Sequence, residues 1–326
     1  MWRADDVEIL ILVENQIDML LPDLEGDGGH CVSRTGLIHH FDPKEIPVQA
    51  ENGISLLVTA RRGRHQMRVM FDVGMTGRVM LHNLEALHQD LDSIDHIVIS
   101  HGHPDHYGGI LPVLEEFPRA VPIASHPDAF LPRYAVMGDG RVAPFYNEGF
   151  QADRLDGGPG RLVMTKDPLE LASGVLTTGE IPRNTSFEGP VVSEDTRKPG
   201  LYQVASDGQL RTDEVWDEQG LVIDLGDEGL VVLTGCAHAG VVNTIHRAQE
   251  LTGNQRIRAV MGGFHLGFPT TPVENVDKTL EALRDLEVQT VVPMHCSGLR
   301  AHTAFSTGME DNYVQPAVGS NFIFGA

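Results

Sequence analysis

The chain lacks the features of secreted and membrane-spanning proteins. Its 326 residues include only three cysteines, which are too few to form a disulfide framework. No apolar run approaches the ~20 residues that a membrane-spanning helix needs. No signal-peptide pattern precedes the first apolar run, Ile9 to Val13. We therefore expect a cytoplasmic protein that has no membrane partner.

Positive charge is scarce as well. The sequence has 24 basic residues against 46 acidic ones, which gives a net charge of -22. Duplex nucleic acid is bound through basic patches that displace counterions, so this composition argues against a nucleic-acid partner. We expect a small-molecule substrate instead, while the composition leaves the oligomeric state open.

Apolar runs predict strands that alternate with helices in both halves of the chain. Strands are predicted at 7–13, 55–59, 68–72, 94–99, 121–124, 220–224, 230–233, 257–261, 290–292 and 322–324. Helices are predicted at 77–91, 109–116, 241–251, 273–286 and near 301. This order predicts one α/β domain over residues 1–326 with two packed sheets. Residues 133–160 and 181–216 are rich in glycine or proline and are predicted to be irregular insertions, either lids or surface loops.

A dense group of metal-ligand residues directly follows the strand predicted at 94–99. His101, His103, Asp105 and His106 form the pattern H-x-H-x-D-H. Histidine and carboxylate side chains are the usual ligands of zinc and similar divalent ions. Functional sites of α/β folds lie at the ends of strands, so the pattern predicts a metal site there.

Three further histidines follow predicted strands in the second half, namely His238, His265 and His295. Their spacing is nearly regular, and each interval is long enough for one helix and one strand. All three side chains can therefore reach the same edge of a sheet. Cys236 and Cys296 lie within two residues of this set and are either ligands or small buried residues beside it. The frequent burial of free cysteine favours the second interpretation.

These motifs resemble those of the metallo-β-lactamase superfamily. Asp72 is similar to its first motif, the segment from His101 to His106 to its second, and His238, His265 and His295 to its third, fourth and fifth. The resemblance implies an αββα four-layer sandwich, in which helices flank two mixed β-sheets.

Several segments are more specifically similar to one subfamily. It includes 7,8-dihydropterin-6-methyl-4-(β-D-ribofuranosyl)aminobenzene-5′-phosphate synthases and related metal-dependent hydrolases. The segments are Glu51–Ser55, Thr178–Arg183, Thr234–His238, Gly262–Leu266 and Pro293–Cys296.

The resemblance implies two metal subsites. The first would comprise His101, His103 and His238, and the second Asp105, His106 and His295. His265 stands where many members have a bridging aspartate, so it would bind one ion, contact the substrate or support the ligands. Asp72 would orient ligands without binding metal itself. Zn²⁺ is the expected ion, in one or two copies, with Mn²⁺ or Fe²⁺ as alternatives.

A bound divalent ion lowers the pKa of water to about 7 and so supplies hydroxide at neutral pH. The leading hypothesis is therefore a metal-dependent hydrolase of a small polar or anionic ester, a phosphoester or a lactone, with Asp105 and His265 as catalytic residues. One alternative is a transferase that condenses a dihydropterin diphosphate with an arylamine. Another is a non-catalytic metal- or ligand-binding protein. Arg183, Glu180 and Glu188 are candidate substrate contacts in the middle region, and the alternative for each is a solvated surface position.

Overall fold

The computed structural model describes residues 3–26, 30–35, 41–145, 150–172, 174–190, 192–193, 195–205, 207–268 and 270–325. Residues 146–149, 191, 194 and 206, which belong to the two predicted insertions, lie outside this described part. Of the helices that the structure describes, none combines the length and the apolar character required to cross a bilayer.

The larger sheet has nine strands in the order β10-β7-β6-β5-β4-β1-β19-β3-β2. Along the chain these are β1 (Asp6–Val13), β2 (Leu24–Gly26), β3 (His30–Ser33), β4 (Ser55–Arg62), β5 (His65–Phe71), β6 (His96–Val98), β7 (Val121–Ser125), β10 (Gly160–Met164) and β19 (Asn321–Gly325). The helices that follow its strands are α2 (Gly77–Ala86), α3 (Pro104–Tyr107), α4 (Ile110–Glu115) and α5 (Ala152–Leu155), with 3-10 turns at Leu91–Ser93 and Pro127–Phe130.

The second sheet has six strands in the order β11-β12-β15-β16-β17-β18. These are β11 (Glu170–Ala172), β12 (Val175–Thr177), β15 (Leu221–Asp224), β16 (Leu230–Thr234), β17 (Ile257–Gly263) and β18 (Val291–Met294). Its helices are α6 (Val241–Thr252), α7 (Val273–Asp285) and α8 (Gly298–Gly308), with 3-10 turns at Gly226–Glu228 and His295–Ser297.

Alternating side chains of the strands build the layers. In β1, Ile9 and Ile11 join a core that also contains Val231 and Leu233 of β16, so this core lies between the two sheets. Leu12 belongs to a different core, which it shares with residues of α2 and α4. Successive side chains of a strand face opposite sides of its sheet, so one strand serves both cores.

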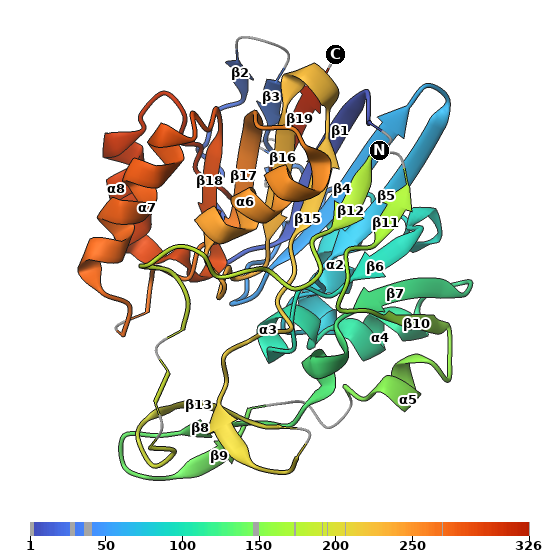
Figure 1. Cartoon of the computed structure of the whole chain (residues 1–326). Helices are drawn as coiled ribbons and strands as arrows, with labels where there is room; N and C mark the ends of the chain where they lie inside the picture. Colours follow the sequence, from blue (N-terminus) through green and yellow to red (C-terminus); the bar gives the residue numbers. More distant parts are fainter. Residues whose placement is uncertain are drawn as a thin grey trace.

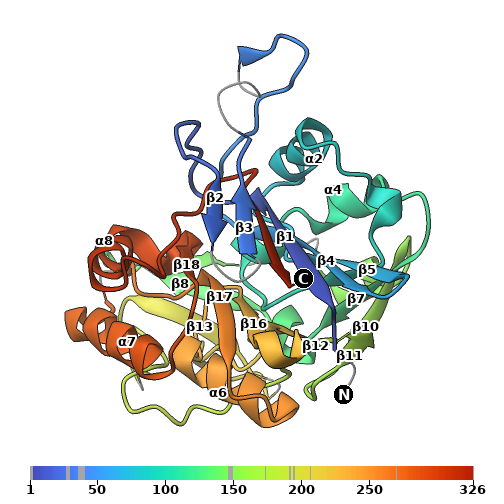
Figure 2. The same cartoon turned by 90° about the horizontal axis from the view of Figure 1, so that it is seen from above.

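The outer face of the second sheet carries its own core, which contains residues of β16 and β17 together with α6, α7 and α8. Figures 1 and 2 show these three helices on the side of the second sheet that faces away from the first. The chain therefore forms the αββα sandwich that the family resemblance implies, with an α/β architecture of mixed sheets.

Parts of both predicted insertions form strands in the structure. They pair with each other in a third sheet of four short strands, in the order β14-β13-β8-β9. The strands are β8 (Arg133–Val136), β9 (Val142–Pro144), β13 (Gly200–Val204) and β14 (Leu210–Thr212). They are short, and most of their residues are half-buried or exposed, so the sequence shows no alternation of buried and polar residues from which to predict them. Figure 1 shows this third sheet below the main body, on the side of α3.

Candidate metal centre

The ends of parallel strands from both sheets supply the candidate site. β5, β6 and β7 run parallel in the larger sheet, and β16, β17 and β18 run parallel in the second. The loops after β5 and β6 therefore meet those after β16, β17 and β18. Gly235 permits this approach, because a Cβ atom there would come within 2.1 Å of Ser100 Oγ.

The predicted histidines are gathered at this edge. The His101 ring lies 4.6 Å from that of His103, 4.1 Å from that of His106 and 4.8 Å from that of His238. The His106 and His295 rings are 5.1 Å apart. Residues distant in the sequence thus form one cluster of buried imidazoles.

In four of these imidazoles, one ring nitrogen lies within hydrogen-bond distance of a side chain outside the cluster. Ser100 Oγ lies 2.9 Å from His101 Nδ1, and Asp213 Oδ2 lies 3.1 Å from His103 Nε2. In the same way, Asp72 Oδ2 lies 2.6 Å from His106 Nδ1, and Asn15 Oδ1 lies 3.2 Å from His295 Nδ1. Such partners fix the ring orientation and leave the other nitrogen free to bind a metal.

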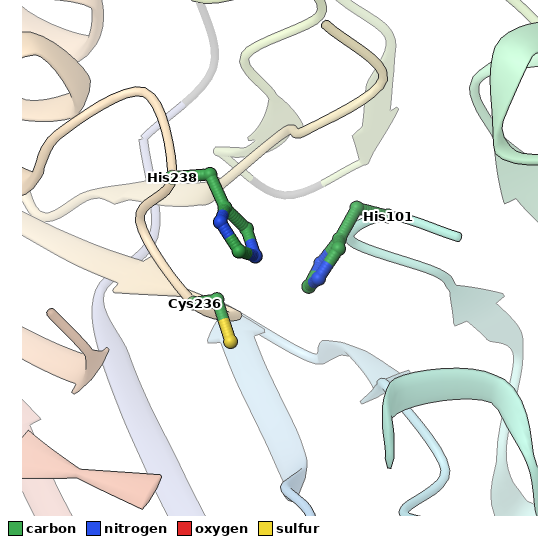
Figure 3. A group of neighbouring side chains, drawn as sticks. All are labelled: His101, Cys236 and His238. Atoms are coloured by element: carbon green, nitrogen blue, oxygen red, sulfur yellow. The ribbon is translucent and has the colours of Figure 1, made fainter. Parts of the chain in front are cut away.

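Two of the inward nitrogens lack hydrogen-bond partners. His101 Nε2 and His238 Nε2 are buried and make no hydrogen bond within the described structure. Figure 3 shows these two rings facing each other beside Cys236. Unsatisfied buried polar atoms are costly, so several of them pointing into one space indicate a ligand that the chain is built to hold. The donor set suits a divalent ion such as zinc.

The environment keeps these ligands in the form that metals bind. Burial, followed by the mutual repulsion of the clustered imidazoles, holds the pKa values of His101 and His238 well below the ordinary value. Both side chains are therefore neutral at pH 7, and neutral imidazole is the metal-binding form.

Asp105 and His295 form a contact on the other side of the cluster, with 3.2 Å between Asp105 Oδ2 and His295 Nε2. Burial acts to raise the pKa of Asp105, but His106 and His295 outweigh it and hold that pKa well below its usual range. Burial acts to lower the pKa of His295, but Asp105 raises it to about 9. A divalent cation bound here would replace the proton that His295 shares with Asp105.

Two buried glutamates that the sequence analysis missed hold the ligand loops through backbone amides. Both carboxylate oxygens of Glu14 accept from the His295 N–H, at 3.1 and 3.0 Å. The oxygens of Glu218 accept from the N–H groups of His238 and Ala239, each at 2.6 Å. Burial raises the pKa of Glu14 and of Glu218 to about 7. The charge of Glu14, directly after an apolar run, is a sequence signal that could have identified it.

A buried ion-pair network joins the third sheet to the H-x-H-x-D-H loop. Arg133 of β8 is fully buried and donates from Nε to Asp213 (2.7 Å) and from Nη2 to Asp217 (2.6 Å). Asp213 contacts His103, and Asp217 accepts from the backbone N–H of Gly102 at 2.7 Å. Arg133 and Asp213 lie in the predicted insertions and Asp217 directly follows the second one, where no motif or spacing points to them.

Comparisons with known proteins identify the family of this chain. The sequence model of the metallo-beta-lactamase superfamily matches residues 64–250. A protein of Methanocaldococcus jannaschii named 7,8-dihydropterin-6-methyl-4-(beta-D-ribofuranosyl)-aminobenzene-5'-phosphate synthase is 31% identical over 271 residues, which cover 82% of this chain and 88% of that protein. The chain belongs to the metallo-beta-lactamase superfamily.

Two further relatives extend the match within this superfamily. An uncharacterized protein of the same organism is 29% identical over 277 residues, which cover 83% of this chain and 92% of that protein. The crystal structure of Tm1679, described as a metal-dependent hydrolase of the beta-lactamase superfamily, has a TM-score of 0.68 and 26% identity. That match covers 97% of this chain and 98% of the other. Membership in the superfamily implies a divalent metal, and the clustered side chains fit one.

His265 has a position at the margin of this superfamily site. Its ring lies 4.1 Å from that of His238 and is stacked on Phe268, with 4.4 Å between the centroids. Its Nδ1 atom makes no hydrogen bond within the described structure. Its backbone φ of 50° is rare for a residue with a side chain, and such strain is concentrated at functional sites.

The three candidate substrate contacts lie outside the imidazole cluster. Arg183 is stacked over Trp216 at 3.9 Å and donates to the backbone carbonyl of Val215 at 3.2 Å. Glu188 is half-buried, and its oxygens accept from the N–H groups of Val242 and Asn243 at 2.9 Å. The structure therefore makes Glu188 a cap of the α6 N-terminus, where a carboxylate satisfies free amides.

Glu180 is partly exposed and binds two neighbours. Its Oε1 atom lies 3.1 Å from His126 Nε2 and 3.2 Å from Lys166 Nζ. With Lys166, Trp216 and Arg247 it lines a separate pocket of about 260 Å³. The Glu180 side chain is 40% exposed, so its carboxylate is accessible to solvent.

Replacing Asp72 with asparagine should lower the metal affinity about 10–100-fold, the usual effect of losing an outer partner of a ligand. The amide loses the charge that orients His106, while its size preserves the packing. Metal binding measured by titration calorimetry tests this, with the exposed Asp92→Asn as the control. An affinity equal to that of the unaltered protein would contradict the orienting role.

Proposed function

We propose that this protein is a metal-dependent hydrolase of a small polar or anionic ester, such as a phosphoester or a lactone. The supporting observation is the pair of buried, unpartnered nitrogens of His101 and His238, whose ligand atoms lie within 4.8 Å of each other in the imidazole cluster. When bound there, a divalent ion supplies hydroxide at neutral pH and polarises the ester oxygen. Zinc suits the histidine-rich donor set best, with one or two ions, and manganese or iron(II) are the alternatives.

The proposed metal ligands form two groups. His101, His103 and His238 hold one ion, and Asp105, His106 and His295 hold the second. The Asp105 side chain is 19% exposed, so it is the ligand that reaches furthest toward solvent and substrate. Its lowered pKa keeps it ionised, so it accepts a hydrogen bond from the attacking water and orients it.

His265 lies next to His238 of the first group. Its free Nδ1 atom and its stacking on the exposed Phe268 place an imidazole and an aromatic ring together beside His238. We assign His265 the role of contacting the substrate or the leaving group. Glu180 and Arg183 are proposed as more distant contacts.

The first experiment is hydrolysis of an activated phosphodiester and of a lactone by the protein before and after chelation. We expect turnover in the protein loaded with zinc or manganese, no turnover after chelation, and recovery when the metal is restored. A fully loaded protein that hydrolyses neither ester would count against the proposal.

The relative of 31% identity favours a second candidate, a synthase that condenses a dihydropterin diphosphate with an arylamine. In that reaction the metal centre would bind the diphosphate leaving group. Product analysis after incubation with both compounds distinguishes the two functions, because condensation joins them and hydrolysis releases the pterin alcohol. A loaded protein that binds these ligands and converts none would be a binding protein.

A further inference from the structure

Cys236 occupies the middle of the imidazole cluster. It follows β16, is 3% exposed, and lies two residues before His238. Its Sγ atom is 3.1 Å from Nε2 of His106, the nitrogen that faces inward because Asp72 holds the other one. Figure 3 shows the Cys236 side chain beside the facing rings of His101 and His238.

The sulfur is within reach of both predicted subsites. Its position is within 4.8 Å of the ligand atoms of His101 and His238, which belong to the first subsite. It is equally within 4.8 Å of those of His106 and His295, which belong to the second. No other side chain of the described structure occurs in both of these groups.

We propose that Cys236 is a metal ligand and that its thiolate bridges the two ions. Zinc–sulfur bonds are about 2.3 Å long, so one sulfur spans two ions separated by the ~3.5–4 Å typical of dinuclear sites. The thiol proton passes to solvent when the ions bind. This inference rests on the metal centre of the proposed function and is independent of the reaction catalysed there.

A bridging thiolate would replace the bridging aspartate that this sequence lacks at the fourth motif. His265 stands where the resemblance places a bridging aspartate, and its ring lies beside His238, outside the His106–His295 pair. A thiolate is an anionic ligand, as is a carboxylate, and neutral imidazole is not. Cys236 would therefore supply the bridging negative charge.

Cys296 has a different environment and does not compete for this role. Its Sγ donates to the carbonyl of Cys236 at 3.3 Å and accepts from the backbone N–H of His265 at 3.3 Å. It shares a ligand group with Cys236 and His265 only. We therefore interpret Cys296 as a support for the two loops.

X-ray absorption of the zinc-loaded protein tests the bridge without any substitution. We expect sulfur at about 2.3 Å from zinc. Two bound ions with only nitrogen and oxygen neighbours would overturn the bridge and leave the proposed hydrolase intact. A protein that binds no ion would overturn both.

Cobalt-substituted variants identify which cysteine is the ligand. We expect thiolate-to-cobalt charge-transfer absorption in the unaltered protein, in Cys296→Ser and in Cys31→Ser, but not in Cys236→Ser. The affinity of Cys236→Ser for the second ion should fall at least about tenfold, as for other losses at a metal site. Absorption that persists in Cys236→Ser, or that disappears in Cys296→Ser alone, would refute the assignment.

Discussion

Replacing Asp105 with alanine should lower turnover at least about 1000-fold, because loss of an outer partner alone costs about 10–100-fold. The Asp105 side chain is 19% exposed and contacts His295, so its removal would affect a proposed ligand and the proposed orientation of water together. His103→Ala should have a comparable effect, since it removes a ligand of the first subsite. Steady-state hydrolysis by metal-loaded variants measures this.

A control variant distinguishes loss of catalytic activity from loss of the folded structure. His88 is exposed, with a side chain 76% accessible, and it pairs with Glu45 at 3.1 Å. His88→Ala should retain full activity, and the circular dichroism of all three variants should match that of the unaltered protein. Full activity in Asp105→Ala or in His103→Ala would refute the assigned site.

Replacing Arg133 with methionine should destabilise the protein by about 3–5 kcal/mol, the usual cost of leaving a buried charge without its partner. The guanidinium is fully buried between Asp213 and Asp217, and methionine restores its volume but not its charge. Because Asp213 also contacts His103, we expect weaker metal binding as well. Denaturant unfolding of the metal-free protein measures the stability change separately from metal binding.

Arg141, in the turn between β8 and β9 of the third sheet, provides the matched comparison. Its side chain is 80% exposed and pairs with Asp139 at 2.7 Å. Exposed pairs contribute about 0–1 kcal/mol, so Arg141→Ala should change the unfolding free energy by no more than that. An equally small change in Arg133→Met would show that the buried network does not support the fold.

The main strands and helices could be predicted because each has enough residues to show a period. β1, β4 and β16 bury alternate side chains in different cores, and α6 and α7 bury one face. The strands of the third sheet have three to five residues and little burial, so no period marks them. The helix predicted at 77–91 ends at Ala86 and is followed by a 3-10 turn, a boundary that periodicity does not define well.

The candidate ligands were predictable for a similar reason. Four of them lie within six positions, and each of the other histidines ends an apolar strand. Their supporting residues were not, with the exception of Asp72. Glu14 contacts the backbone of His295 and Glu218 that of His238, and contacts across such sequence separations leave no local pattern.

The sequence by itself determined the α/β alternation, the family resemblance and the candidate ligands, because these follow from periodicity and from motifs and their spacing along the chain. Only the tertiary structure decided which nitrogen of each imidazole faces inward, that Glu188 caps a helix, and that Arg133 ties the third sheet to the ligand loop. It also placed the Cys236 sulfur within 4.8 Å of the ligand atoms of His101 and His238 and of those of His106 and His295. These are distances between segments that meet only when the two sheets pack, and the order of residues along the chain does not encode them directly.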